Sequence, residues 1–273
     1  MPLKQPILIN LSLPKCGSSS INDYCVNMNS RHEAWHSGVT ETYIKVLNNK
    51  YPKIAFLKYL EFRQIALGLE IDSATFHHFY AEDIINLFPS STYIHIYRDP
   101  YKWILSMINM WTFFNDVHFH ILKTGNEKEK SESKNWIKWL NIYAKVYSKS
   151  LNTYKVKEFS NKKENSEFNI LINDLLDFWV LTSRNIISIK HNYQQVNIFN
   201  LNQNDEIKLF IDRVINNVAT NSLREFPKSN RMKVINREGN KPYFNMSQIK
   251  NLISKDKIYL KDKTYEELNC VKN

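Results

Sequence analysis

The fold is decided near the N-terminus, by the stretch Ile7-Leu8-Ile9-Asn10-Leu11-Ser12-Leu13-Pro14-Lys15-Cys16-Gly17-Ser18-Ser19-Ser20-Ile21. It opens with a short apolar run of the kind that buried strands show. Pro14 and Gly17 break the run, and serine is a favoured N-cap, so we expect a helix to begin at about Ser19 or Ser20. A strand, a tight loop and a helix N-terminus direct backbone amides toward one point. With the charge of Lys15, the stretch predicts an anion site.

A second transition from strand to helix lies further along the chain. Residues 91–97 are rich in β-formers and lead directly into Arg98-Asp99-Pro100. Asp99 is expected to cap the next helix, with Pro100 at its first position. Arg98 then stands at the carboxyl end of a strand, where open α/β sheets bind ligands. Ser106 lies about two helical turns beyond it, so both side chains can face one anion.

Working outward from these two anchors, we expect further strands over residues 53–59 and 195–201. Helical periodicity predicts helices over 21–28, 41–49, 61–69, 81–88, 135–150, 170–189 and 205–217. This alternation favours an α/β fold with a central, mostly parallel sheet flanked by helices. We expect one domain over residues 1–273, with a polar surface loop or lid inserted around 115–168, where 123–135 and 155–167 are the most polar parts.

The composition limits the possible partners and compartments. A net charge of +10 and a pI of about 9.3 favour anionic partners: nucleic acid, membrane headgroups or a polyanionic small molecule. No apolar run is long enough to span a bilayer, and the N-terminus lacks a signal-peptide core. Three cysteines without metal or disulfide spacing suggest a reducing compartment. We therefore expect a cytoplasmic protein.

Together the two anchors resemble the cofactor site of the sulfotransferases that use 3′-phosphoadenylyl sulfate (PAPS). Pro-Lys-x-Gly-Ser-Ser-Ser at 14–20 is similar to their 5′-phosphosulfate loop, whereas a Walker loop would place the lysine after its second glycine. Arg98-Asp99-Pro100 followed by Ser106 is similar to their 3′-phosphate site. A late Arg237-Glu238-Gly239 resembles the family's Arg-Lys-Gly, with one positive charge fewer. The resemblance implies a P-loop-like sulfotransferase fold, PAPS as co-substrate, PAP as product, no metal, and cofactor contacts from Lys15, Cys16, Gly17, Ser18, Ser19, Ser20, Arg98, Ser106, Arg237 and Gly239.

The same resemblance implies the catalytic groups. Lys15 would stabilise charge on the leaving phosphate, and a histidine or glutamate would take the acceptor's proton. One candidate cluster is His32-Glu33-Ala34-Trp35-His36, where Glu33 matches a family base and His36 and His32 are alternatives. The other is His77-His78, which precedes Arg98 by an interval similar to that of the base histidine in phenol and steroid sulfotransferases. We favour the Glu33 and His36 cluster over His77 and His78.

The predicted activity is sulfuryl transfer from PAPS to a hydroxyl, or an amine, of a small-molecule acceptor. The Asn-, Lys- and Ile-rich composition is typical of microbial proteins, so we expect a bacterial enzyme of secondary metabolism that sulfates a toxin or alkaloid. We expect neither nucleic acid nor membrane as a partner. Two alternatives stay open: a zinc hydrolase using His32-Glu33-x-x-His36, and a basic nucleic-acid-binding module.

Overall fold

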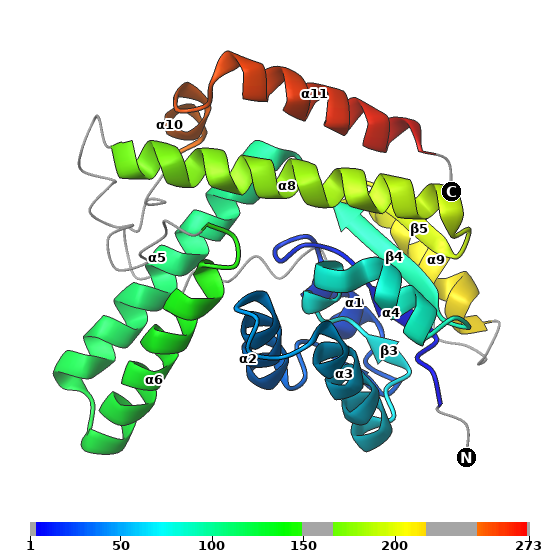
Figure 1. The fold of residues 1–273 in the computed structure, drawn as a ribbon, viewed down its shortest axis with the longest axis horizontal. Helices are drawn as coiled ribbons and strands as arrows, with labels where there is room; N and C mark the ends of the chain where they lie inside the picture. The colour runs from blue at the N-terminus through cyan, green and yellow to red at the C-terminus, as the bar shows by residue number, and fades with distance from the viewer. Residues whose placement is uncertain (1–3, 149–165, 217–244, 272–273) are drawn as a thin grey trace. The chain divides into compact units, whose positions relative to one another are not determined.

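A computed structural model of the chain describes residues 4–148, 166–216 and 245–271 (Figure 1). The strands are β1 (Leu8–Asn10), β2 (Ser30–Arg31), β3 (Ile71–Asp72), β4 (Thr92–Tyr97) and β5 (Val196–Asn200). The helices are α1 (Ser18–Tyr24), α2 (His36–Leu47), α3 (Lys53–Leu67), the 3₁₀ helix η1 (Phe76–Tyr80), α4 (Ala81–Leu87), α5 (Pro100–Thr124), α6 (Glu127–Ala144), α8 (Ser166–Asn192), α9 (Asn204–Asn216), α10 (Met246–Asn251) and α11 (Lys255–Cys270). The chain divides into two compact units, the first comprising Met1–Arg98, Ser183–Arg237 and Glu267–Asn273, and the second Asp99–Thr182 and Glu238–Glu266.

The first unit is built on a parallel sheet. Within the described residues it has five strands in the order β2-β3-β1-β4-β5, and every pair is parallel. Leu8 pairs with Ile71 on one side and with Thr92 on the other, so β1 is central. Parallel strands need helical crossovers, which cover the faces of the sheet. The structure thus confirms the predicted α/β class.

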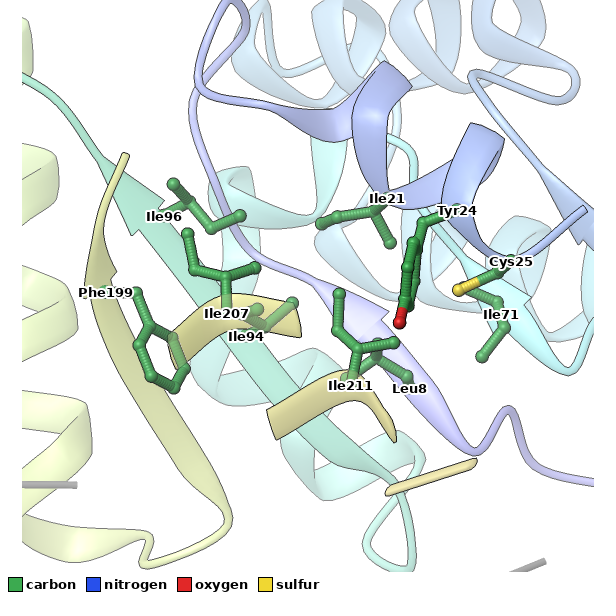
Figure 2. Packing of buried hydrophobic residues seen from close by; sticks show 10 residues of the cluster. All are labelled: Leu8, Ile21, Tyr24, Cys25, Ile71, Ile94, Ile96, Phe199, Ile207 and Ile211. Carbon is green, nitrogen blue, oxygen red and sulfur yellow. The ribbon is translucent and has the colours of Figure 1, made fainter. Parts of the chain in front are cut away.

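One face of this sheet carries a cluster of buried apolar side chains, drawn in Figure 2. Side chains alternate between the two faces of a strand, so Ile94 and Ile96 of β4 point to the same side. Ile21 of α1 and Ile207 of α9 pack onto that side, and all four are fully buried. Helices α1 and α9 therefore cover this face, and their packing fixes where the loop between β1 and α1 emerges.

The opposite face is covered in part by α4. Tyr93 points to this side, and its hydroxyl donates to the carbonyl oxygens of Ile84 and Phe88, at 3.1 and 2.7 Å. The Ile84 carbonyl also accepts from the Phe88 amide at 2.9 Å, and Phe88 is the residue that follows the helix. The Tyr93 hydroxyl thus ties the helix that precedes β4 to the middle of the sheet.

The second unit is helical. Helices α5 and α6 form a hairpin whose turn is set by Asn126, which caps α6 in a capping box with Glu129. Trp103 of α5 stacks on Phe178 of α8, and Lys257 of α11 forms an ion pair with Asp177. Among the described helices, none combines the length and apolar character required to cross a membrane.

Two local predictions are wrong. Residues 53–59, expected as a strand, are the first half of α3, and the helix expected over 61–69 is its second half. Phe56, Leu60 and Gln64 are buried at helical spacing, a period that a seven-residue window cannot distinguish from a strand. The polar residues 123–135 predict a loop, yet only Gly125 and Asn126 separate two helices there. Their polar composition reflects an exposed helix face.

The buried face of α9 gives a direct test of the core. Replacing the fully buried Ile207 with alanine leaves a cavity and is expected to cost about 2–5 kcal/mol of unfolding free energy. Leu209 on the same helix is 52% exposed, so Leu209→Ala is the matched control and should stay within about 0.5 kcal/mol of the parent. Urea unfolding measures both. Equal losses would mean that α9 does not pack on the sheet through Ile207.

Candidate functional site

The candidate site lies where the two central strands end. Strand β3 lies on one side of β1 and β4 on the other, so the chain switches sides between them. Ligands of open α/β sheets bind beyond the carboxyl ends of strands at such a switch. The loop after β1 continues along β4, because the Leu11 amide donates to the Ile94 carbonyl at 2.8 Å and the Ile96 amide to the Ser12 hydroxyl at 2.6 Å.

The loop between β1 and α1 makes a tight turn with two left-handed residues. Lys15 has φ 65° and Gly17 has φ 96°, a region that residues other than glycine rarely adopt. A Cβ atom on Gly17 would lie 3.2 Å from a methyl group of Leu201, so that side chain would have to shift slightly to admit a larger residue. Helix α1 begins directly after it, at Ser18, one residue before the predicted start.

Arg98 meets this loop from the end of β4. Its Nη1 donates to the Lys15 carbonyl oxygen at 3.2 Å. Its Nε is buried and has no hydrogen-bond partner within the described residues. Burial, and then the charge of Arg98, lower the pKa of the Lys15 ammonium. Two cations and a buried donor without an acceptor favour an anionic ligand at this point.

Cys16 and the serines of this loop differ in exposure. Burial raises the pKa of the Cys16 thiol to about 12, against the opposing effect of Arg98, so the thiol stays protonated at neutral pH. Ser18 and Ser20 are buried, and Ser19 is half-buried. Cys16 therefore stays a neutral thiol. The serine hydroxyls and the backbone amides are the hydrogen-bond donors that this loop can offer to an anion.

His32 reaches the serines from the segment that follows β2. Its Nε2 lies 3.0 Å from the Ser18 hydroxyl and 3.2 Å from the Ser19 hydroxyl. The same nitrogen is 3.7 Å from Oε1 of Glu33. This places an imidazole and a carboxylate beside the loop that carries Lys15.

Glu33 is held from the turn after β3. Its Oε1 accepts hydrogen bonds from the backbone amide and the hydroxyl of Thr75, at 2.9 and 2.7 Å. Its backbone has φ 54°, and that of Trp35 has φ 58°. These left-handed residues separate His32 from His36, which begins α2.

The alternative of a zinc hydrolase is therefore wrong. The His-Glu-x-x-His motif needs one continuous helix that places both histidines on the same face. In this chain β2 ends at Arg31 and α2 begins at His36, with two left-handed residues in between. Residues 32–35 connect the strand to the helix, and His36 is already the first helical residue.

His77 and His78 lie on η1 and are both buried. Nδ1 of His77 is 3.0 Å from the Asn10 carbonyl oxygen, and its Nε2 is 3.0 Å from the Asp72 carboxylate. Nδ1 of His78 contacts the Thr75 carbonyl. Nδ1 of His77 is also 3.1 Å from the Ala74 carbonyl, so the imidazoles of His77 and His78 each contact the turn after β3.

Three further residues were predicted to contact the 3′-phosphate: Ser106, Arg237 and Gly239. Ser106 is half-buried on α5, in the second unit, and the predicted cap of that helix is confirmed, since Asp99 accepts from the Lys102 amide at 2.9 Å. Arg237 and Gly239 lie outside the described residues, and their contacts to the 3′-phosphate stay predictions.

Two residues near the site escaped the sequence analysis. Arg63 of α3 is 1% exposed and pairs with the buried Asp72 at the end of β3. A signal was available, because Phe56, Leu60 and Arg63 follow one another at the spacing of a buried helical stripe. A cation on such a stripe requires a buried partner.

Comparison with known protein families matches residues 7–174 to a family described as the sulfotransferase domain. No curated protein matches the chain significantly. The family match covers more than half of the chain and includes both the loop around Lys15 and the end of β4 at Arg98. The chain therefore belongs to the sulfotransferase domain family and is a PAPS-dependent sulfotransferase.

Proposed function

We propose that this enzyme transfers the sulfuryl group of PAPS to a hydroxyl, or an amine, of a small-molecule acceptor. The observation that supports it most is the hydrogen bond from Arg98 to the Lys15 carbonyl. This bond joins the loop after β1 to the end of the adjacent strand β4, so Lys15 and Arg98 stand on neighbouring strands. PAPS carries phosphates at both its 5′ and its 3′ positions, which suits two cationic anchors on neighbouring strands.

In this proposal the loop from Lys15 to Ser20 binds the 5′-phosphosulfate. Arg98 binds the 3′-phosphate together with Ser106, Arg237 and Gly239. A bound dianion supplies the acceptor that the buried Arg98 Nε lacks. It also offsets the repulsion between Arg98 and Lys15 that contributes to the lowered pKa of the lysine.

We assign the proton acceptor to the pair His32 and Glu33. Nε2 of His32 faces Ser18 and Ser19, on the loop that would carry the sulfuryl group. A proton taken from the acceptor hydroxyl onto this nitrogen gives an imidazolium, which the nearby Glu33 carboxylate stabilises. Lys15 stabilises the charge that develops on the leaving phosphate as the sulfur–oxygen bond breaks. His36, His77 and His78 are the alternative bases.

The bacterial origin of the acceptor is proposed from composition. The Asn-, Lys- and Ile-rich chain is typical of microbial proteins, and we propose a bacterial secondary metabolite, such as a toxin or alkaloid, acted on in the cytoplasm. We also propose that residues 1–273 work as one sulfotransferase domain. Incubating the enzyme with ³⁵S-labelled PAPS and extracts of the producing organism would identify the labelled product.

Arg98→Ala tests the cofactor site. A hydrogen bond to a charged group contributes about 1.5–3 kcal/mol, so PAP affinity should fall by about 10- to 100-fold. Arg213→Ala is the matched control, because it removes an equal charge from the exposed last turn of α9. Isothermal titration calorimetry with PAP measures both variants. Unchanged affinity in Arg98→Ala, or no PAP binding by the parent, would overturn the assignment.

Glu33→Gln and His32→Gln test the proton acceptor. A general base contributes about 10²- to 10⁴-fold, so kcat should fall within this range while PAP affinity stays close to that of the parent. Turnover is followed as PAP released from PAPS, with water or a panel of phenols and alcohols as acceptor.

The exposed His191 of α8 provides the control variant His191→Gln, which should retain the parent's rate. A large loss in His36→Gln or His78→Gln, with none in Glu33→Gln and His32→Gln, would move the base to the other candidates.

A further inference from the structure

The segment that carries His32 and Glu33 is held in a conformation that it would not adopt by itself. Glu33 and Trp35 are both left-handed, which costs of order 1–3 kcal/mol for each residue that is not glycine. Such a backbone persists only where neighbouring groups determine it. The contacts of residues 32–35, defined here as the base segment, show which groups these are.

Helix α3 supplies one of these groups from the interior. Nε of Arg63 donates to the Ala34 carbonyl at 2.7 Å, between the two left-handed residues. Its two terminal nitrogens donate to the two carboxylate oxygens of Asp72. The planar guanidinium therefore bonds the base segment and the end of β3 at once, which a lysine ammonium on one flexible stem cannot reproduce.

Asp72 is in turn fixed by His77, whose Nε2 lies 3.0 Å from the carboxylate. Burial by itself would raise the pKa of Asp72, but Arg63 and His77 hold it well below its usual range. The carboxylate thus stays ionised and keeps both Arg63 bonds over the working pH range.

These contacts join three parts of the site. His77 also bonds the Asn10 carbonyl at the end of β1, and the Asn10 side chain donates to the Ser73 and Ala74 carbonyls, at 3.4 and 3.3 Å. The next residue of that turn, Thr75, holds the Glu33 carboxylate. The end of β1, the turn after β3 and the base segment are therefore linked through buried polar groups.

A buried ion pair is weak evidence for stability, since an apolar replacement of similar volume is often as stable. What such a network fixes is geometry. Here the geometry is that of the segment from which His32 reaches Ser18 and Ser19. This connects a fully buried arginine to the chemistry of the site.

We propose that Arg63 is a positioning residue for sulfuryl transfer, which holds His32 and Glu33 against the phosphosulfate loop through the Ala34 carbonyl. The role rests on the proposed function, because it acts through the assigned base. The hydrogen bonds of Arg63 go to the Ala34 carbonyl and the Asp72 carboxylate and not to the loop of Lys15, so we expect its effect on kcat and not on cofactor binding.

Arg63→Met and Arg63→Lys are the test variants. A displacement of about 1 Å in a catalytic group can cost about 100-fold, so kcat of Arg63→Met should fall by about this factor while PAP affinity stays near the parent's. Arg63→Lys keeps the charge and one of the bonds, and should lie between Arg63→Met and the parent. It also serves if Arg63→Met does not fold.

Gln64→Leu is the matched control. Gln64 is the next residue of α3, is 2% exposed, and donates to two backbone carbonyls, those of Lys4 and Leu69, each at 2.9 Å. Gln64→Leu removes both hydrogen bonds and should lower the unfolding temperature of the enzyme, but it should leave kcat of the folded enzyme unchanged.

A double-mutant cycle separates positioning from a general effect on the fold. If Arg63 acts through the base, Arg63→Met should lower kcat far less in the Glu33→Gln background than in the parent. The proposal would be overturned if the kcat losses of Arg63→Met and Glu33→Gln multiply in the double variant. It would also be overturned by a kcat loss of the same size in Gln64→Leu, or by a kcat loss in neither Arg63 variant.

Other results would contradict the proposed function itself. Absence of PAP binding or of PAP release by the parent overturns the assignment of the site. Unchanged kcat in both Glu33→Gln and His32→Gln overturns the base.

Discussion

The structure of the site depends on one contact, the hydrogen bond from the Arg98 guanidinium to the Lys15 carbonyl. It is possible because β1 and β4 are neighbours in a parallel sheet, so their carboxyl ends lie at the same edge. Lys15 and Arg98 are far apart in the sequence, but the strand order of the sheet places them at the ends of adjacent strands. The charge of Arg98 contributes to the lowered pKa of the Lys15 ammonium, and a bound anion would offset this repulsion.

The two strands that flank β1 lead to different parts of the site. On the β4 side, Lys15 and Arg98 form a cationic point suited to the phosphates of PAPS. On the β3 side, the turn after Asp72 holds the base segment through Thr75 and Arg63. Strand β1 contributes to both, since its loop carries Lys15 and its last residue, Asn10, bonds the turn. In the proposed function, donor binding and proton transfer therefore meet at the central strand.

Much of this arrangement could be predicted from sequence because its signals are local. A strand followed by Pro, Gly and serines, and a strand followed by Arg-Asp-Pro, each specify a turn into a helix. The two-residue strands β2 and β3 have no comparable signal, since their pairing is a tertiary effect. The strand predicted over 53–59 is wrong because a short apolar run fits either period. The contacts of Arg63 with Ala34 and Asp72 join segments that no local pattern relates.

The burial of the thiols near the site has a practical consequence. Cys16 in the loop and Cys25 after α1 are buried, and burial raises the pKa of each to about 12. Maleimides react with the exposed thiolate form, so both should resist alkylation in the folded enzyme. Cys270, at the end of α11, is exposed. A fluorophore or surface tether can therefore be attached there without engineering the chain, leaving the cofactor loop chemically untouched.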